Sequence, residues 1–166
     1  MIPIVSVVGK SGAGKTTFLE GLIREIKRRG YRLAVVKHDT HGFEIDKPGK
    51  DTWRMAQAGT DVVVISSPEK MAMIKKTGRD MPLDEIARYI GDDVDLILSE
   101  GYKREDKPKI EVSRSEVSRE LLCTADELLA LATDQAFDMD VPQFALDDIV
   151  GLVDLLERQV LGRRQG

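Results

Sequence analysis

Short runs of apolar residues alternate along the chain with longer segments in which apolar and polar residues are mixed. The run at Ile4–Val8 is continuous and rich in β-branched residues, as expected of a strand that is buried on both faces of a sheet. Residues 32–37 and 94–98 are predicted to be buried strands of the same kind. Two further strands are predicted at Lys109–Ser113 and 127–133. This succession is typical of parallel strands joined by helices.

Amphipathic helices are predicted between the strands. The first follows a glycine-rich segment, and its apolar side chains recur at helical spacing up to a stop at Gly30. The residues of this apolar face are Phe18, Leu19, Leu22, Ile23 and Ile26. Further helices are predicted at 51–58, 82–90 and 147–161, the last of them capped by Asp147.

One pair of strands departs from the parallel pattern. Residues 61–66 and 71–77 are separated by the short segment 67–70, which predicts an antiparallel β-hairpin. The sequence therefore predicts an α/β fold of three layers, in which a mostly parallel sheet has helices on both faces and the hairpin forms an extension. Residues 1–161 are expected to form a single domain, and the polar tail at 162–166 is expected to fray.

Composition limits the classes of function. The 25 Lys and Arg residues are outnumbered by 29 Asp and Glu residues, and the net charge of −4 argues against a nucleic-acid partner. No apolar run approaches the roughly 20 residues that span a bilayer, so no membrane association is expected. Cys123 is the single cysteine and cannot form an internal disulfide, which favours a reducing cytoplasm. The apolar N-terminus is interpreted as a strand and not as a signal peptide.

The segment between the first predicted strand and the first predicted helix carries the strongest chemical signal. Its glycines, lysine and threonine fit the phosphate-loop pattern G-x-x-x-x-G-K-[ST], and strand, loop and helix are the context that this pattern requires. Glycines let main-chain N–H groups turn toward a phosphate, and the helix adds its positive N-terminal end. The expected fold is therefore that of a P-loop NTPase. The predicted nucleotide-binding residues of this segment are Gly9, Ser11, Gly12, Ala13, Gly14, Lys15, Thr16 and Thr17.

Two residues of the loop have predicted chemical roles. Lys15 is expected to contact the β and γ phosphates and to act in catalysis, and the Thr16 hydroxyl is expected to ligate Mg²⁺. A phosphate-bound Mg²⁺ usually needs an acid near the carboxyl ends of the strands as well. In the predicted strand 94–98, Asp95 lies at the start and Glu100 lies just past the end, about 17 Å away. Glu100 is therefore predicted to act in catalysis, either on Mg²⁺ or by orienting water.

Asp39 follows the predicted strand 32–37 and is a further candidate metal ligand by the same positional argument. The polar segment around it, 37–54, is a candidate switch that responds to a γ-phosphate through ion pairs, although a solvated loop has a similar composition. His38 and His41 lie in this segment, but two histidines without a cysteine cluster make a poor transition-metal site. Further along the chain, Lys103 and Arg104 form either a second anion site or an exposed charged turn.

Recognition of the nucleotide base is assigned to Thr133 and Asp134, at the end of the predicted strand 127–133. A carboxylate at this point can accept hydrogen bonds from N1 and N2 of guanine. The usual guanine motif has Asn-Lys ahead of the aspartate, whereas this chain has Leu131 and Ala132. Guanine recognition therefore rests on Asp134, whose alternative role is to cap a loop.

Several stretches of the sequence together resemble one known family. They are GKSGAGKTT (9–17), VVKHDTHGFEIDKPGKDTWRMAQAG (35–59), LILSEGYK (96–103), KIEV (109–112) and LLALATD (128–134). The second stretch is much more specific than the phosphate loop. With these features the chain resembles the molybdopterin-guanine dinucleotide biosynthesis protein B (MobB) family of P-loop GTP-binding proteins, over most of its length up to about Asp134.

This resemblance implies a cytoplasmic homodimer that binds GTP and Mg²⁺. It also implies a partner, the molybdopterin guanylyltransferase of the same pathway, which the family assists in attaching GMP to molybdopterin. Carried over to this chain, the phosphate site is residues 9–17, Mg²⁺ lies near Thr16 and Glu100, and the subunit contact falls on the hairpin at 61–77. Molybdopterin itself is a further candidate ligand, although no residue marks a pterin pocket.

Two other functions share some of these features. A small-molecule kinase uses the same phosphate loop but needs an arginine-rich lid, and no such segment is evident in the sequence. A nickel-insertion GTPase shares the general fold, but the chain holds only 2 His and 1 Cys. No arginine outside the loops is evidently directed at the phosphates, so hydrolysis of GTP is expected to be slow.

Overall fold

A computed structural model of the chain describes residues 1–162. The predicted polar tail, 162–166, lies outside the described residues from position 163 onward. The described chain forms two compact units, one made of Met1–His38 with the chain from Leu83 onward, and one made of Asp39–Pro82. The expectation of one nucleotide-binding domain over residues 1–161 stays a prediction.

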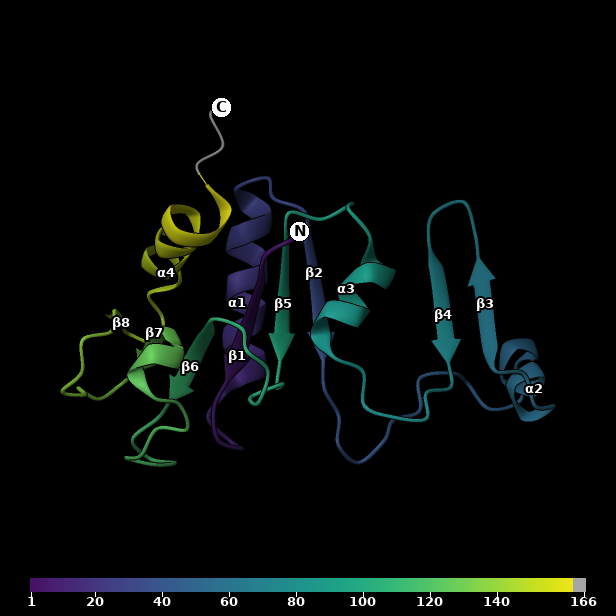
Figure 1. The fold of residues 1–166 in the computed structure, drawn as a ribbon, viewed down its shortest axis with the longest axis horizontal. Coiled ribbons are helices and arrows are strands. Elements are labelled where there is room, and N and C mark those ends of the chain that lie inside the picture. The colour runs from purple at the N-terminus through teal and green to yellow at the C-terminus, as the bar shows by residue number, and fades with distance from the viewer. Residues whose placement is uncertain (163–166) are drawn as a thin grey trace. The chain divides into compact units, whose positions relative to one another are not determined.

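The first unit is built around a six-stranded sheet with the order β2-β5-β1-β6-β7-β8 (Figure 1). Every pair of neighbouring strands in this sheet is parallel. The elements are β1 (Ile4–Val8), α1 (Lys15–Arg28), β2 (Leu33–Lys37), α3 (Leu83–Ile90), β5 (Leu96–Glu100), β6 (Lys109–Ser113), the 3-10 turn η1 (Ala125–Glu127), β7 (Leu128–Thr133), β8 (Gln143–Phe144), α4 (Ile149–Leu156) and the π-helical segment η2 (Glu157–Leu161).

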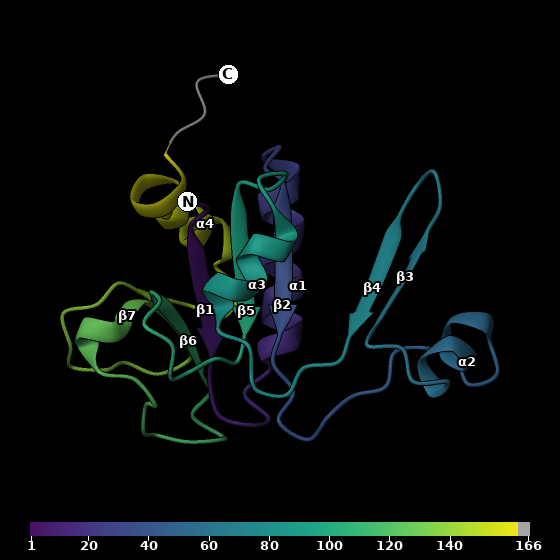
Figure 2. The same cartoon turned by 45° about the vertical axis from the view of Figure 1, so that its right-hand side comes forward.

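Helices cover both faces of the sheet because alternate residues of each strand point to opposite sides. Val5 and Leu98 belong to the larger core cluster, together with buried side chains of α1 and α4. Ile4 and Ile97 belong to a second cluster, which they share with Leu83 of α3. Figure 2 shows α1 and α3 on opposite sides of the sheet. The predicted three-layer α/β architecture is confirmed.

The third predicted strand begins two residues later than expected. The prediction placed it at 94–98, whereas β5 begins at Leu96 and ends at Glu100. Its polar end stays in the strand because Ser99 donates a buried hydrogen bond of 2.8 Å to the Ser6 hydroxyl on β1. Asp95 lies before the strand, where its carboxylate pairs with the Arg32 guanidinium at 3.0 Å. Glu100 is therefore the last residue of β5 and not a residue beyond it.

The prediction that residues 32–37 form a fully buried strand was wrong. β2 pairs only with β5 and lies at the edge of the sheet, so one of its sides has no neighbouring strand. Val35, in the middle of β2, is 44% exposed. A run of β-branched residues does not distinguish an edge strand from a central one.

The ends of the helices agree with the predictions in part. Gly30 ends α1 as expected, with φ +84° and its N–H donating to the Lys27 carbonyl. The cap of the last helix is Asp148 and not the predicted Asp147, because it is the Asp148 carboxylate that accepts the Gly151 N–H at 3.0 Å. The two-residue strand β8 was not predicted. None of the helices in residues 1–162 combines the length and the apolar character needed to cross a membrane.

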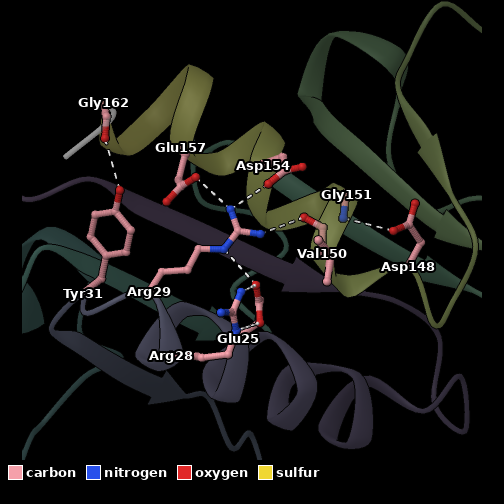
Figure 3. A network of polar contacts seen from close by, with 10 residues as sticks. All are labelled: Glu25, Arg28, Arg29, Tyr31, Asp148, Val150, Gly151, Asp154, Glu157 and Gly162. Carbon is pink, nitrogen blue, oxygen red and sulfur yellow. Dashed lines mark hydrogen bonds and ion pairs between the residues drawn. The ribbon is translucent and has the colours of Figure 1, made fainter. Parts of the chain in front are cut away.

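A network of ion pairs joins α1 to α4 and η2 (Figure 3). The Arg29 guanidinium, whose side chain is only 13% exposed, donates hydrogen bonds of 2.7 to 2.8 Å to Glu25, Asp154 and Glu157. It also donates to the Val150 carbonyl at 3.2 Å. Arg29 thus ties the first helix to the last one at the rim of the larger core cluster.

The second unit contains one helix and the predicted hairpin. Its elements are α2 (Asp51–Gln57), β3 (Val62–Ser66) and β4 (Met71–Lys75). The two strands are antiparallel, with Val64 opposite Met73 and Ser66 opposite Met71, so the predicted hairpin is confirmed. Opposite residues of such a pair lie on one face. The face formed by Val62, Val64, Met71 and Met73 is exposed at all four of these residues.

Candidate functional site

The loop between β1 and α1 has glycines where a side chain would collide with its surroundings. A Cβ on Gly9, whose φ is +153°, would lie 2.5 Å from the Val112 carbonyl oxygen on β6. Gly14 is the N-cap of α1 with φ +82°, and its Cβ would lie 3.1 Å from Nε of Arg114. The chain therefore turns sharply here while its main chain passes close to β6.

The N-terminal end of α1 is open to an external anion. Its N-cap, Gly14, has no side chain to accept a hydrogen bond, and the first turn holds no acidic residue. The first N–H groups of a helix have no acceptor inside the helix, and the helix dipole makes this end positive. Thr16 and Thr17 are exposed in this first turn, and Ser11 and Gly12 are exposed in the loop. This arrangement is suited to a phosphate group.

Lys15 lies over the same loop. Its Nζ donates hydrogen bonds to the carbonyl oxygens of Gly9 at 2.9 Å and Lys10 at 3.1 Å. The side chain is half-buried. Its ammonium group is therefore held beside the exposed N–H groups of the helix start, where a phosphate oxygen can replace a carbonyl as acceptor. The predicted role of Lys15 toward the β and γ phosphates is compatible with this position and stays a prediction.

Glu100 lies at the carboxyl end of β5, next to the strand that leads into the loop. In the parallel register it stands opposite Val7 on one side and Lys37 on the other. Its side chain is 13% exposed, and its Oε1 lies 3.6 Å from Nζ of Lys37. The following N–H, that of Gly101, donates to the Val7 carbonyl at 3.2 Å. A carboxylate in this place faces the edge of the sheet where ligands of open α/β folds bind.

The oxygen donors near the loop fit the preferences of Mg²⁺. Thr16 offers an exposed hydroxyl in the first turn of α1, and Glu100 offers a carboxylate at the strand end. Mg²⁺ prefers oxygen and is commonly held by one or two protein ligands together with phosphates. Asp39, the third predicted ligand, belongs to the second unit, where its Oδ1 accepts the His41 N–H at 2.8 Å. No cluster of three or more His, Cys, Asp or Glu side chains suited to a metal occurs in the described chain.

The residues assigned to the base lie at the carboxyl end of β7. Thr133 is buried, and its hydroxyl accepts the Gln135 N–H at 3.2 Å. Asp134 accepts the Ser115 N–H at 2.7 Å and the Ser115 hydroxyl at 3.2 Å. The Ser115 N–H lowers the pKa of the Asp134 carboxyl, and the charge of Arg114 contributes to this shift. Asp134 therefore caps the loop after β6 in this structure, and its contact with guanine stays a prediction.

Two residues of β6 and its end were not singled out from the sequence. Arg114 donates from Nε to the Ala13 carbonyl in the phosphate loop at 2.9 Å. Glu111 is 1% exposed, and its carboxylate accepts the N–H groups of Leu122 at 2.7 Å and Cys123 at 3.0 Å. The position of Arg114 directly after a buried strand could have identified it from the sequence. The same positional argument selected Asp39, which follows the predicted strand 32–37.

The chain is similar to named proteins of one family over nearly its whole length. Residues 4–134 match the family model described as MobB, molybdopterin guanine dinucleotide synthesis protein B. A protein of Haemophilus influenzae named molybdopterin-guanine dinucleotide biosynthesis adapter protein is 37% identical over 157 residues, which are 94% of this chain and 88% of the relative. A protein of the same name from Escherichia coli is 34% identical over 161 residues, covering 94% and 92% of the two chains.

A solved structure shows the same similarity in three dimensions. The crystal structure of Bacillus subtilis MobB superposes with a TM-score of 0.74 at 30% sequence identity. The superposition covers 98% of this chain and 100% of that chain. The match therefore includes both compact units and is not restricted to the phosphate loop.

Proposed function

The chain belongs to the MobB family, and on this premise we propose that it is a cytoplasmic GTP-binding accessory protein of molybdopterin guanine dinucleotide biosynthesis. Its relatives are named as adapter proteins of that biosynthesis, which supports a role in the same process. In this proposal the protein assists a molybdopterin guanylyltransferase in attaching GMP to molybdopterin. It hydrolyses GTP at most slowly.

The observation that carries the nucleotide part of the proposal is the uncapped start of α1 beneath Lys15. A glycine N-cap, an absence of acids in the first turn and a half-buried ammonium group together create a local positive site in a chain of net charge −4. A triphosphate has the charge and the acceptor atoms that such a site binds. A pterin or adenine ring without phosphates lacks the negative charge that these N–H and ammonium groups are placed to bind.

Mg²⁺ would be held by Thr16 and Glu100 in this proposal. The ion would supply positive charge that offsets the charge of the phosphates. The protein's own part is to place its donors: Lys15 contacts the phosphates, the N–H groups of the first turn of α1 donate to them, and Glu100 orients the metal or a water. The Glu100 carboxylate lies 3.6 Å from the Lys37 ammonium group, and this ion pair helps to hold it at the strand end beside the loop.

Cofactor content of a molybdoenzyme tests the proposal directly. In a bacterial strain that lacks its own adapter of this family, an enzyme that uses molybdopterin guanine dinucleotide should contain less of this cofactor than the same enzyme from the parent strain. Expression of the present chain should raise the content of guanine dinucleotide, measured as GMP released by acid hydrolysis. A control enzyme that uses unmodified molybdopterin should not change. Equal guanine content with and without the chain would argue against the function.

The exposed face of the hairpin supports the homodimer in the proposal. A two-stranded sheet is marginally stable in water when it stands alone, and apolar side chains exposed on one face favour burial against another surface. Val64 is 55% exposed at the centre of this face, and both strands have an outer edge that no strand of the described chain occupies. We assign a second copy of the chain as the occupant, which gives a symmetric contact.

Val64→Lys should therefore weaken self-association by about tenfold or more. The substitution places a charged group in an apolar contact, and dimerisation would have to remove that charge from water. The matched control is Ile65→Lys, since Ile65 is 56% exposed but points to the opposite face of the hairpin. Sedimentation velocity over a range of protein concentrations measures the dimer dissociation constant of each variant. A wild-type chain that is monomeric throughout, or equal weakening by both substitutions, would contradict this assignment.

A further inference from the structure

Arg114 connects two parts of the chain that lie far apart in sequence but side by side in the fold. It follows directly after β6, which pairs with β1 on the sheet, and β1 leads into the phosphate loop. Its Nε donates to the Ala13 carbonyl at 2.9 Å. A Cβ on Gly14 would lie 3.1 Å from Nε and 3.2 Å from Nη2, so the guanidinium group lies against the Gly14 main chain.

This contact determines the direction of one main-chain N–H group. The carbonyl of Ala13 and the N–H of Gly14 belong to the same peptide unit, which is trans, and they point in opposite directions. Because Arg114 holds the carbonyl on the side of β6, the Gly14 N–H points away from Arg114. In the described chain this N–H donates to no main-chain acceptor. It is therefore free for a ligand at the open start of α1.

Arg114 also places a fixed positive charge beside the loop. The side chain is half-buried, which limits its movement, and its remaining N–H groups make no other hydrogen bond in the described chain. An arginine guanidinium is a planar cation with several N–H donors, which suits it to contacts with oxygen acceptors. Lys15 is the other cation that donates to main-chain carbonyls of this loop, and it does so from the helix side.

We propose that Arg114 is a positioning residue for nucleotide phosphates, which orients the Ala13–Gly14 peptide so that the Gly14 N–H donates to a bound phosphate. The inference rests on the proposed function of the loop as a triphosphate site. It goes beyond the loop motif, because the motif holds no arginine and Arg114 lies about 100 residues further along the chain. The ligand class is any nucleoside diphosphate or triphosphate whose phosphates reach the loop.

Substitution of Arg114 should reduce the affinity for GTP and for GDP alike. Arg114→Gln removes the charge and the rigid donor, and we expect about a tenfold loss for both nucleotides, since a hydrogen bond involving a charged group is lost. Arg114→Lys keeps the charge but cannot reproduce the planar contact at Nε, so it should recover only part of the affinity. The matched control is Arg119→Gln, an exposed arginine on the same loop.

A spectroscopic measurement separates positioning from general damage to the fold. In protein labelled with ¹⁵N-glycine, the Gly14 amide resonance should shift downfield on addition of GDP to the wild-type chain, as expected of a new hydrogen bond to phosphate. In Arg114→Gln that shift should be reduced at saturating GDP, whereas the resonance of Gly30, at the far end of α1, should be the same in both proteins. Arg119→Gln should behave as wild type.

The outcomes distinguish this inference from the proposed function. A wild-type chain that binds neither GTP nor GDP would overturn both. A different result would overturn the role of Arg114 alone. In that result the wild-type chain binds both nucleotides, Arg114→Gln and Arg114→Lys bind them as tightly as the wild type does, and the Gly14 resonance shifts by the same amount in all three proteins. If Arg114→Gln fails to fold, Arg114→Lys decides, because the affinity and the Gly14 shift of that variant must still fall below those of the wild type.

Discussion

Lys15→Ala is expected to weaken GTP binding by about a hundredfold or more, because hydrogen bonds between an ammonium group and phosphate oxygens are among the strong ones. The stability of the fold should hardly change. In the structure the Lys15 ammonium group donates only to two loop carbonyls, those of Gly9 and Lys10, and packs no part of the core. Loss of affinity without loss of stability is the result that identifies a binding residue.

Titration calorimetry with GTP in the presence of Mg²⁺ measures the affinity, and thermal unfolding without nucleotide measures the stability. Lys27→Ala is the control, because Lys27 lies in the last turn of the same helix and the charge change is the same. Its Nζ donates to the Tyr31 carbonyl, far from the loop. Equal affinities of Lys15→Ala and the wild type would remove the main support for the phosphate site.

The sequence predicted the fold well where local pattern and topology agree. Ile4–Val8 and Lys109–Ser113 are continuous strands in both prediction and structure, because each is buried in the middle of a parallel sheet. The hairpin was recognisable from the short connection at 67–70. In contrast, the predicted range of β5 began and ended two residues too early. The polar end of this strand is held in the sheet by contacts with Ser6 and Lys37 on other strands. Such contacts are not visible in the residues of the strand itself.

The candidate site was predicted in the same uneven way. The phosphate loop is a contiguous motif, so Gly9, Gly14 and Lys15 could be named from the sequence alone. Arg114 could not, because its contact with Ala13 exists only through the pairing of β1 with β6. Asp134 satisfied the positional argument for a base contact, yet its carboxylate is occupied by Ser115, a partner that no spacing rule indicates.

Removal of the Arg29 side chain is expected to lower the stability of the fold strongly, because this one guanidinium pairs with several carboxylates. Arg29→Met keeps much of the apolar stem but takes away the partner of three carboxylates, on Glu25, Asp154 and Glu157 (Figure 3). These groups then repel one another at the junction of α1 with the C-terminal helix. We expect a loss of about 2 to 3 kcal/mol in the free energy of unfolding, or roughly 5 to 10 °C in Tm.

The pH dependence of this loss has a definite sign. Hydrogen bonds from Arg28 and Arg29 lower the pKa of Glu25 from 4.5 to about 2. Because the pKa is lower in the folded state, ionised Glu25 stabilises the fold above pH 4.5, and this contribution disappears as the pH falls toward 2. Arg29→Met should lose part of this stabilising contribution, since only Arg28 remains beside Glu25. The difference in stability between wild type and variant should therefore narrow on acidification from pH 6 to about pH 3.

Arg24→Met provides the matched control for Arg29. Arg24 lies in α1, the helix that Arg29 follows, and pairs with one carboxylate, that of Glu20 at 2.9 Å, but its side chain is 75% exposed. An exposed pair of this kind contributes at most about 0.5 kcal/mol, so Tm should change little at any pH. Chemical denaturation at several pH values gives the free energies for all three proteins. If Arg29→Met were as stable as Arg24→Met, or if its deficit grew on acidification, the network would not join the two helices as inferred from its geometry.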